Sequence, residues 1–268
     1  MVIPGPEPIE RGIASSADGI GIAWSRYGTG PSTILFVPTW NLVDSRVVGH
    51  QVVALAPRAT VVTYDPRGAG ASDRPPTGYD FTDHAADALA VLDATGTERA
   101  SVVTASRGLN AAILLAVEHP KRIERIAVIG PYMRLEPDPP PPDPTVLASW
   151  RTDWRGFIDP FMHAVFSEPD SDDVIAEMIG IGMDSSPDVV ATQETELDWV
   201  SPAQRMGEVA CPVLVIHGAE DGPVPVSHAE EIVAALPNAR LAVIPGGGHR
   251  PDIRSPERVN PLLLDFLY

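Results

Sequence analysis

Residues 101–120, SVVTASRGLNAAILLAVEHP, decide the fold. They combine an apolar β-branched run at Val102 and Val103, an abrupt Ser-Arg-Gly turn that begins at Ser106, and a long apolar helical stretch. A sharp turn from a buried strand into a helix exposes a hydroxyl at the end of the strand. The N-terminus of the helix offers N–H groups to a developing anion. We therefore predict that Ser106 is a nucleophile. The alternative is that Ser106 only caps the helix, because serine is favoured there.

Short apolar runs and helical patterns alternate on both sides of this stretch. Residues 11–16 and 20–26 flank Asp18-Gly19, a pair that predicts a hairpin. Further strands are predicted at 32–37, 60–64, 100–104 and 123–129, and helices at 47–55, 82–95 and after Ser106. Strands that are apolar throughout and alternate with helices predict a mostly parallel sheet of the α/β class, covered by helices on both faces.

The pattern changes at 136–144, EPDPPPPDP, where consecutive prolines predict a stiff extended connector. Residues 146–206 then look helical and are rich in large apolar side chains. The α/β alternation resumes with strands at 213–217 and 241–244 and helices at 227–236 and 256–267. A helical block between two stretches of one sheet is expected to cover the carboxyl edge of the sheet. We predict a core of residues 1–133 and 208–268 and a helical lid of residues 134–207.

A serine nucleophile needs a base, and the base needs an orienting acid. Asp221 lies in a turn-rich loop four residues after a predicted strand, and His249 follows the next strand and three glycines. Because parallel strands end at one edge of the sheet, we expect Ser106, Asp221 and His249 to meet there. Glu220 or Asp252 could replace Asp221 as the acid.

The remaining histidines are assigned no chemistry. His217 ends a strand and is interpreted as structural, and the others are interpreted as surface or helix residues: His50, His84, His119, His163 and His228.

Composition excludes several kinds of partner. The chain has 268 residues, with 36 acidic against 19 basic residues and a formal charge of −17, so binding of nucleic acid or of an anionic membrane is not expected. We find no run of 18 apolar residues, no secretory signal pattern and no cluster with metal-site spacing. The single cysteine, Cys211, cannot form an internal disulfide, which favours a cytoplasmic protein. We expect a small-molecule substrate and leave a homodimer open.

Four segments, taken together, resemble the α/β-hydrolase superfamily over nearly the whole chain. Residues 37–40, VPTW, stand at the family's oxyanion loop, and residues 65–72, DPRGAGAS, match its Asp-x-Arg-Gly-x-Gly-x-Ser turn. Residues 104–108, TASRG, stand at the nucleophile elbow, and the loops of Asp221 and His249 complete the set. The chain is similar to lid-containing esterases, C–C bond hydrolases and cofactor-free haloperoxidases.

The resemblance implies an eight-stranded sheet and an oxyanion hole formed by the backbone N–H groups of Trp40 and Arg107, with no metal or cofactor. Two positions depart from the family pattern. Thr104 replaces the first glycine of the elbow, and Pro38-Thr39 replaces the usual His-Gly of the oxyanion loop.

These features predict a serine hydrolase that acts on a small, largely apolar ester, lactone, thioester or β-diketone-like substrate through an acyl-enzyme. The alternative is a cyclase, lyase or dehydratase on the same fold, which the two departures motivate, and a ligand-binding protein without turnover ranks last. Arg107 is expected to stay solvated or to attract a substrate carboxylate. Candidate pocket residues are taken from the lid: Trp150, Trp154, Phe161 and Trp199.

Overall fold

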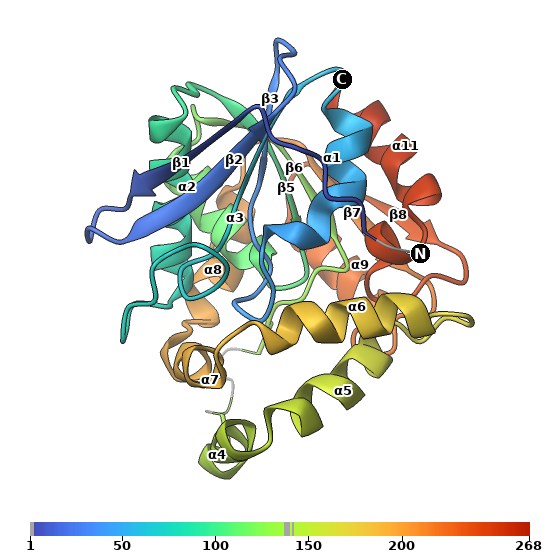
Figure 1. Ribbon diagram of the computed structural model, residues 1–268. Coiled ribbons are helices and arrows are strands. Elements are labelled where there is room, and N and C mark those ends of the chain that lie inside the picture. The colour runs from blue at the N-terminus through green and yellow to red at the C-terminus, as the bar shows by residue number, and fades with distance from the viewer. Residues whose placement is uncertain (1–2, 137–139, 141) are drawn as a thin grey trace.

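The strands form one mixed sheet. In chain order they are β1 (Glu10–Ser15), β2 (Gly21–Tyr27), β3 (Thr33–Phe36), β4 (Thr60–Tyr64), β5 (Ala100–Ala105), β6 (Ile123–Ile129), β7 (Val213–Gly218) and β8 (Ala239–Ile244). The computed structural model describes residues 3–136, 140 and 142–268, so part of the predicted proline connector lies outside the described residues. The eight strands follow the order β1-β2-β4-β3-β5-β6-β7-β8 (Figure 1).

Only the first part of the sheet is antiparallel. Strands β1 and β2 pair as the predicted hairpin, and β2 pairs antiparallel with β4. From β4 to β8 every neighbouring pair is parallel. All residues of β5 and β7 are buried, as expected for strands that are covered on both faces. The predicted fold class, a mostly parallel eight-stranded α/β sheet, is confirmed.

Helices cover both faces of the sheet. They are α1 (Gly49–Leu55), α2 (Phe81–Ala94), α3 (Gly108–Glu118), α4 (Pro144–Thr152), α5 (Trp154–Val165), α6 (Asp172–Met183), α7 (Pro187–Glu196), α8 (Val200–Gln204), α9 (Val226–Ala235), α10 (Pro251–Arg254) and α11 (Pro256–Leu267), with 3₁₀ turns η1 (Ser45–Val48) and η2 (Met206–Glu208). Helix α10 was not expected from the sequence, because four residues are too few to show a helical period. Apolar residues of α2, α3 and α9 pack in one core cluster, and those of α1 and α11 pack in another.

Helices α4–α7 are inserted between β6 and β7 and gather on one side of the sheet (Figure 1). A third apolar cluster joins α5 and α6 to Trp40, Leu42 and Val43 in the segment that follows β3. The inserted helices therefore pack on the same segment that the sequence assigns to the oxyanion loop. Among the described residues, no helix combines the length and apolarity that crossing a membrane requires.

Candidate active site

Ser106 lies at the turn between β5 and α3. Its backbone φ of +50° falls in the left-handed region, and its N–H donates to the Ile129 carbonyl oxygen at 2.8 Å. Helix α3 begins at Gly108 with Arg107 at its N-cap, so the Ser106 hydroxyl does not cap the helix. A Cβ at Gly108 would collide with the carbonyl oxygen of Pro38, which shows how closely the helix start approaches the loop after β3. The turn leaves the Ser106 hydroxyl available to a partner outside the helix.

Ser106, His249 and Asp221 lie in a hydrogen-bonded row. The Nε2 atom of His249 lies 3.1 Å from the Ser106 Oγ, and its Nδ1 atom lies 2.7 Å from the Asp221 Oδ2. Because a carboxylate only accepts hydrogen bonds, a neutral His249 ring donates from Nδ1 and presents Nε2 as the acceptor for the serine hydroxyl. Asp221 is held in turn by the N–H of Val224, which donates to its Oδ1 at 2.8 Å. The row has the geometry of a nucleophile, a base and an orienting acid.

The two alternative acids lie elsewhere. Glu220 is exposed, and its hydrogen bond to the loop uses its backbone N–H. Asp252 is buried, and both of its carboxylate oxygens accept from the Arg250 guanidinium, at 2.9 and 2.7 Å. Asp221 is therefore the carboxylate that contacts the ring of His249.

The side chain of His217 contacts the Asp221 carboxylate. Its side chain is fully buried, and its Nε2 lies 2.9 Å from the carbonyl oxygen of Val224 and 3.3 Å from the Asp221 Oδ2. Both neighbours of Nε2 are acceptor oxygens, so Nε2–H is the donor to them. Burial lowers the pKa of His217, which favours the neutral ring. The prediction that His217 is structural fits this position.

The histidine loop is held by the sheet and by the helical insertion. Gly218 ends β7, where a Cβ would collide with the carbonyl oxygens of Gly247 and Gly248. On the other side, the Gly248 N–H donates to the Glu168 carboxylate at 2.6 Å. The His249 N–H donates to the carbonyl oxygen of Val165 at 3.3 Å. The loop that carries His249 is thus held both by β7 and by the helical insertion.

Thr104 is accommodated in the elbow by a hydrogen bond of its own. Its buried hydroxyl donates to the carbonyl oxygen of Val37 at 2.9 Å. The side chain that replaces the family's glycine therefore ties the elbow to the start of the loop after β3.

A cavity of about 290 Å³ opens beside Ser106 and His249. Its lining is mostly apolar and consists of Thr39, Trp40, Leu42, Val43, Ser106, Arg107, Tyr132, Phe161, Met162, Val165, Met178, Pro223, Val224, His249 and Arg250. Of the four pocket residues predicted from the sequence, Phe161 is among the described residues that line this cavity. The other three, Trp150, Trp154 and Trp199, are not among them. Residues 161, 162 and 165 are spaced as one face of α5, a period that could have identified them from the sequence.

The three tryptophans outside the lining pack with other aromatic rings. Trp150 stacks on Phe157 with centroids 4.3 Å apart, and Trp154 also contacts Phe157. Trp199 packs edge-on against Phe81 and Tyr132, with centroids 5.0 and 5.4 Å apart. These rings join the inserted helices to one another and to the core.

The charge of Arg107 is neutralised inside the protein. Its guanidinium forms an ion pair with the Glu194 carboxylate of α7, and both side chains are nearly buried. The guanidinium carbon also lies 5.2 Å from the centroid of the Trp199 ring. From the sequence, we expect Arg107 either to stay solvated or to attract a substrate carboxylate. Neither expectation describes this arrangement, because the guanidinium is nearly buried and its partner is a carboxylate of the protein itself, on helix α7.

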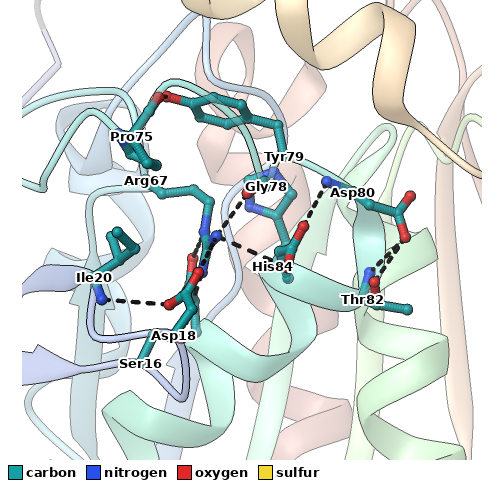
Figure 2. Close-up of polar contacts among 12 residues, drawn as sticks. Ser16, Asp18, Ile20, Arg67, Pro75, Gly78, Tyr79, Asp80, Thr82 and His84 are labelled. Carbon is teal, nitrogen blue, oxygen red and sulfur yellow. Dashed lines mark hydrogen bonds and ion pairs between the residues drawn. The ribbon is translucent and has the colours of Figure 1, made fainter.

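Arg67, in the 65–72 turn, connects several loops of the core through a buried guanidinium. Its side chain is fully buried and makes two hydrogen bonds to Asp87, at 2.7 and 2.6 Å. It also donates to Asp18 at 2.9 Å and to the carbonyl oxygen of Gly78 at 2.6 Å. Figure 2 shows the contacts of the Arg67 guanidinium with Asp18 and Gly78.

The comparisons with known proteins agree with the geometry. The profile of the Alpha/beta hydrolase family matches residues 34–262. RutD of Caulobacter sp. (strain K31), provisionally named a carbamate hydrolase, is 33% identical over 232 residues, which cover 81% of this chain and 84% of the relative. Serine hydrolase BPHL of Mus musculus is 25% identical, and the match covers 100% of this chain and 92% of the relative.

Among solved structures, Est816, described as an N-acyl homoserine lactone degrading enzyme, superposes with a TM-score of 0.83 at 27% identity. The superposition covers 95% of this chain and 100% of Est816. The family profile spans most of the chain, and the fold and the relatives agree with it. The chain belongs to the alpha/beta hydrolase family.

Proposed function

We propose that the protein is a serine hydrolase that cleaves a small, neutral and largely apolar ester, lactone, thioester or β-diketone-like substrate through an acyl-enzyme. The observation that carries this proposal is the row Ser106–His249–Asp221 at the wall of an apolar cavity. The inserted helices, for which we propose residues 134–207 as the boundaries, form the lid over this cavity.

In the first half of the reaction, the Ser106 Oγ attacks the substrate carbonyl carbon while the His249 Nε2 accepts the hydroxyl proton. Asp221 stabilises the imidazolium that forms and keeps the ring oriented. His249 then gives the proton to the leaving group as the bond to it breaks. In the second half, a water molecule loses a proton to His249 and attacks the acyl carbon. The bond between this carbon and the Ser106 Oγ then breaks, and His249 returns the proton to Oγ, which releases the acid and restores the Ser106 hydroxyl.

The negative charge of each tetrahedral intermediate needs donors on the carbonyl oxygen. We assign this role to the backbone N–H groups of Trp40 and Arg107. Among the hydrogen bonds between described residues, none uses either of these two N–H groups, so both are available for an oxyanion. Both residues line the cavity together with Ser106.

The character of the cavity supports a neutral substrate. Its two cations, Arg107 and Arg250, are each paired with a carboxylate of the protein, Glu194 and Asp252. The rest of the wall beside Ser106 is mainly apolar and aromatic. RutD is named for carbamate hydrolysis, BPHL for serine hydrolase activity and Est816 for degradation of an N-acyl homoserine lactone. These names also support an acyl-transfer reaction.

Intact-mass analysis after treatment with a fluorophosphonate tests the proposal. We expect one adduct, located on Ser106 by peptide mapping, together with hydrolysis of p-nitrophenyl butyrate. His249→Ala should lose both, while His163→Ala, at a histidine whose side chain is 57% exposed, should keep both. A folded wild-type protein that forms no adduct and hydrolyses no ester would contradict the proposal and favour non-hydrolytic chemistry.

A further inference from the structure

Two consecutive residues of helix α7, Gln193 and Glu194, reach from the inserted helices into the core. Gln193 is 1% exposed, and the side chain of Glu194 is 9% exposed. Their partners, Asn41 and Arg107, belong to different segments, one after β3 and one after β5. These are the two segments that carry the proposed oxyanion donors, Trp40 and Arg107.

The contact with the first segment runs through Asn41, the neighbour of Trp40. The Gln193 side-chain amide donates to the Asn41 Oδ1 at 3.0 Å and lies 3.0 Å from the Nε2 of His84. Asn41, fully buried, donates in turn to the carbonyl oxygen of Arg67 at 2.6 Å. Because Arg67 is itself fixed by its buried ion pair with Asp87, Asn41 is held between a rigid part of the core and helix α7.

The histidine in this network accepts a hydrogen bond. Burial lowers the pKa of His84 to about 4, so its ring is neutral near pH 7 and its Nε2 can accept from Gln193. The two N–H groups of the Gln193 amide thus have two acceptors, Asn41 and His84. This arrangement fixes the orientation of the amide.

The contact with the second segment runs through Arg107 itself. The Glu194 carboxylate pairs with the guanidinium, which lies against the ring of Trp40. The side chains of the two donor residues are therefore in contact with each other. Helix α7 contacts Arg107 through Glu194, and it contacts Asn41, the neighbour of Trp40, through Gln193.

We propose that Gln193 and Glu194 are positioning residues, whose contacts with Asn41 and Arg107 hold the two halves of the oxyanion hole in register. This inference rests on the proposed function. Oxyanion donors act at 2.7–3.1 Å from the charged oxygen, and a displacement of about 1 Å can cost about 100-fold in rate. The ground-state substrate, held mainly by apolar contacts, depends much less on this register.

Two variants and a matched control test the proposal. Gln193→Leu removes the contact with Asn41, and Glu194→Ala removes the contact with Arg107. The control is Glu196→Ala, on the same helix. The Glu196 carboxylate accepts from the N–H groups of Gly78 and Tyr79, at 2.9 and 2.8 Å, and so joins α7 to the core away from Trp40 and Arg107. Glu194→Gln is the conservative substitute if Glu194→Ala does not fold.

Steady-state kinetics on p-nitrophenyl butyrate should show a fall in kcat of about 10- to 100-fold for both variants, with KM within about threefold of wild type. The affinity for 1,1,1-trifluoro-2-octanone, which forms a tetrahedral adduct on the serine, should fall in parallel with kcat/KM. The affinity for 1-octanol, which only fills the cavity, should stay the same. Glu196→Ala should change neither kcat nor the affinity for the ketone.

Failure of this inference is distinguishable from failure of the proposed function. If wild type forms the Ser106 adduct but the two variants keep wild-type kcat and ketone affinity, the positioning role is wrong and the hydrolase remains. An equal loss in Glu196→Ala would reduce the role of α7 to general packing and also overturn the inference. If wild type neither forms the adduct nor hydrolyses esters, the proposed function and this inference fail together.

Discussion

The guanidinium carbon of Arg107 lies 4.1 Å from the centroid of the Trp40 ring. The guanidinium also forms an ion pair with the Glu194 carboxylate, so its charge is compensated by the protein before any substrate binds. An arginine directly after a nucleophilic serine suggests recognition of an anion, but this arginine instead connects the elbow, the loop after β3 and helix α7.

The pairing of Arg107 predicts selectivity for neutral substrates. Among the described residues of the lining, both arginines are already paired. A carboxylate brought beside them would be desolvated without a free cation to meet it, which is unfavourable. We expect kcat/KM for p-nitrophenyl butyrate to exceed that for the p-nitrophenyl monoester of glutaric acid by about 100-fold, equivalent to a free-energy difference of about 3 kcal/mol. In Glu194→Gln, which leaves Arg107 unpaired, this ratio should decrease. Equal kcat/KM for the two esters in wild type would contradict the prediction.

The acid of the row can be identified by two matched substitutions. Asp221→Asn leaves the shape intact but favours the wrong tautomer of His249, so kcat should fall by about 10,000-fold with the protein folded. Asp252→Asn should instead lower the melting temperature, because buried Arg250 loses charge pairing, with a much smaller change in kcat. The two enzymes are compared by ester hydrolysis and by thermal denaturation. A kcat for Asp221→Asn close to that of wild type would exclude Asp221 as the acid.

The buried ion pair of Arg67 and Asp87 predicts a non-additive effect on stability. Arg67→Met leaves the Asp87 carboxylate without its strongest partner in the interior, so the free energy of unfolding should fall by about 3–5 kcal/mol. Arg67→Met combined with Asp87→Leu should recover part of this loss, because no unpaired buried carboxylate remains at position 87. Urea unfolding measures all three proteins. A double variant that is less stable than Arg67→Met alone would contradict this prediction.

The buried His84 predicts that stability falls on mild acidification. Its pKa is lowered to about 4 by burial and by Arg67, against the opposing effect of Asp87 and Asp80, whereas the unfolded chain binds the proton near pH 6.5. Between these values the unfolded state takes up a proton that the native state does not. The free energy of unfolding should therefore decrease by about 2 kcal/mol from pH 6.5 to pH 5 through this residue. Well above pH 6.5 His84 is neutral in both states, and this loss of stability is absent.

The measurement is urea unfolding of wild type and of His84→Gln at each pH. The difference between their free energies of unfolding isolates the titration of His84 from that of the other groups. We expect this difference to shift in favour of the variant as the pH falls. A difference that is constant between pH 6.5 and pH 5 would show that His84 titrates alike in both states.

The sequence was sufficient for the fold and for the meeting of Ser106, Asp221 and His249. Each of these residues follows a strand of the parallel sheet, and parallel strands end at a common edge. Apolar runs and turn residues identify such strands without any knowledge of side-chain contacts. The order of the three loops along the chain then brings the three side chains together.

Contacts between the inserted helices and the core could not be predicted in the same way. Glu194 is 87 residues from Arg107, and Gln193 is 152 residues from Asn41. These pairs depend on how α7 lies on the core, which no periodicity specifies. For the same reason the sequence located aromatic residues in the insertion but did not separate Phe161, which lines the cavity, from Trp150, which stacks on Phe157.

The left-handed backbone conformation of Ser106 lowers the stability of the fold, whereas the serine at this position provides the proposed nucleophile. For an L-residue, a φ of +50° destabilises the folded state by about 1 kcal/mol or more, whereas glycine adopts this φ without that strain. Ser106→Gly should therefore unfold at a higher temperature than wild type while losing its reactive oxygen. If the gene were evolved in the laboratory for heat resistance alone, with no demand for turnover, glycine at position 106 is the substitution we would expect to be enriched.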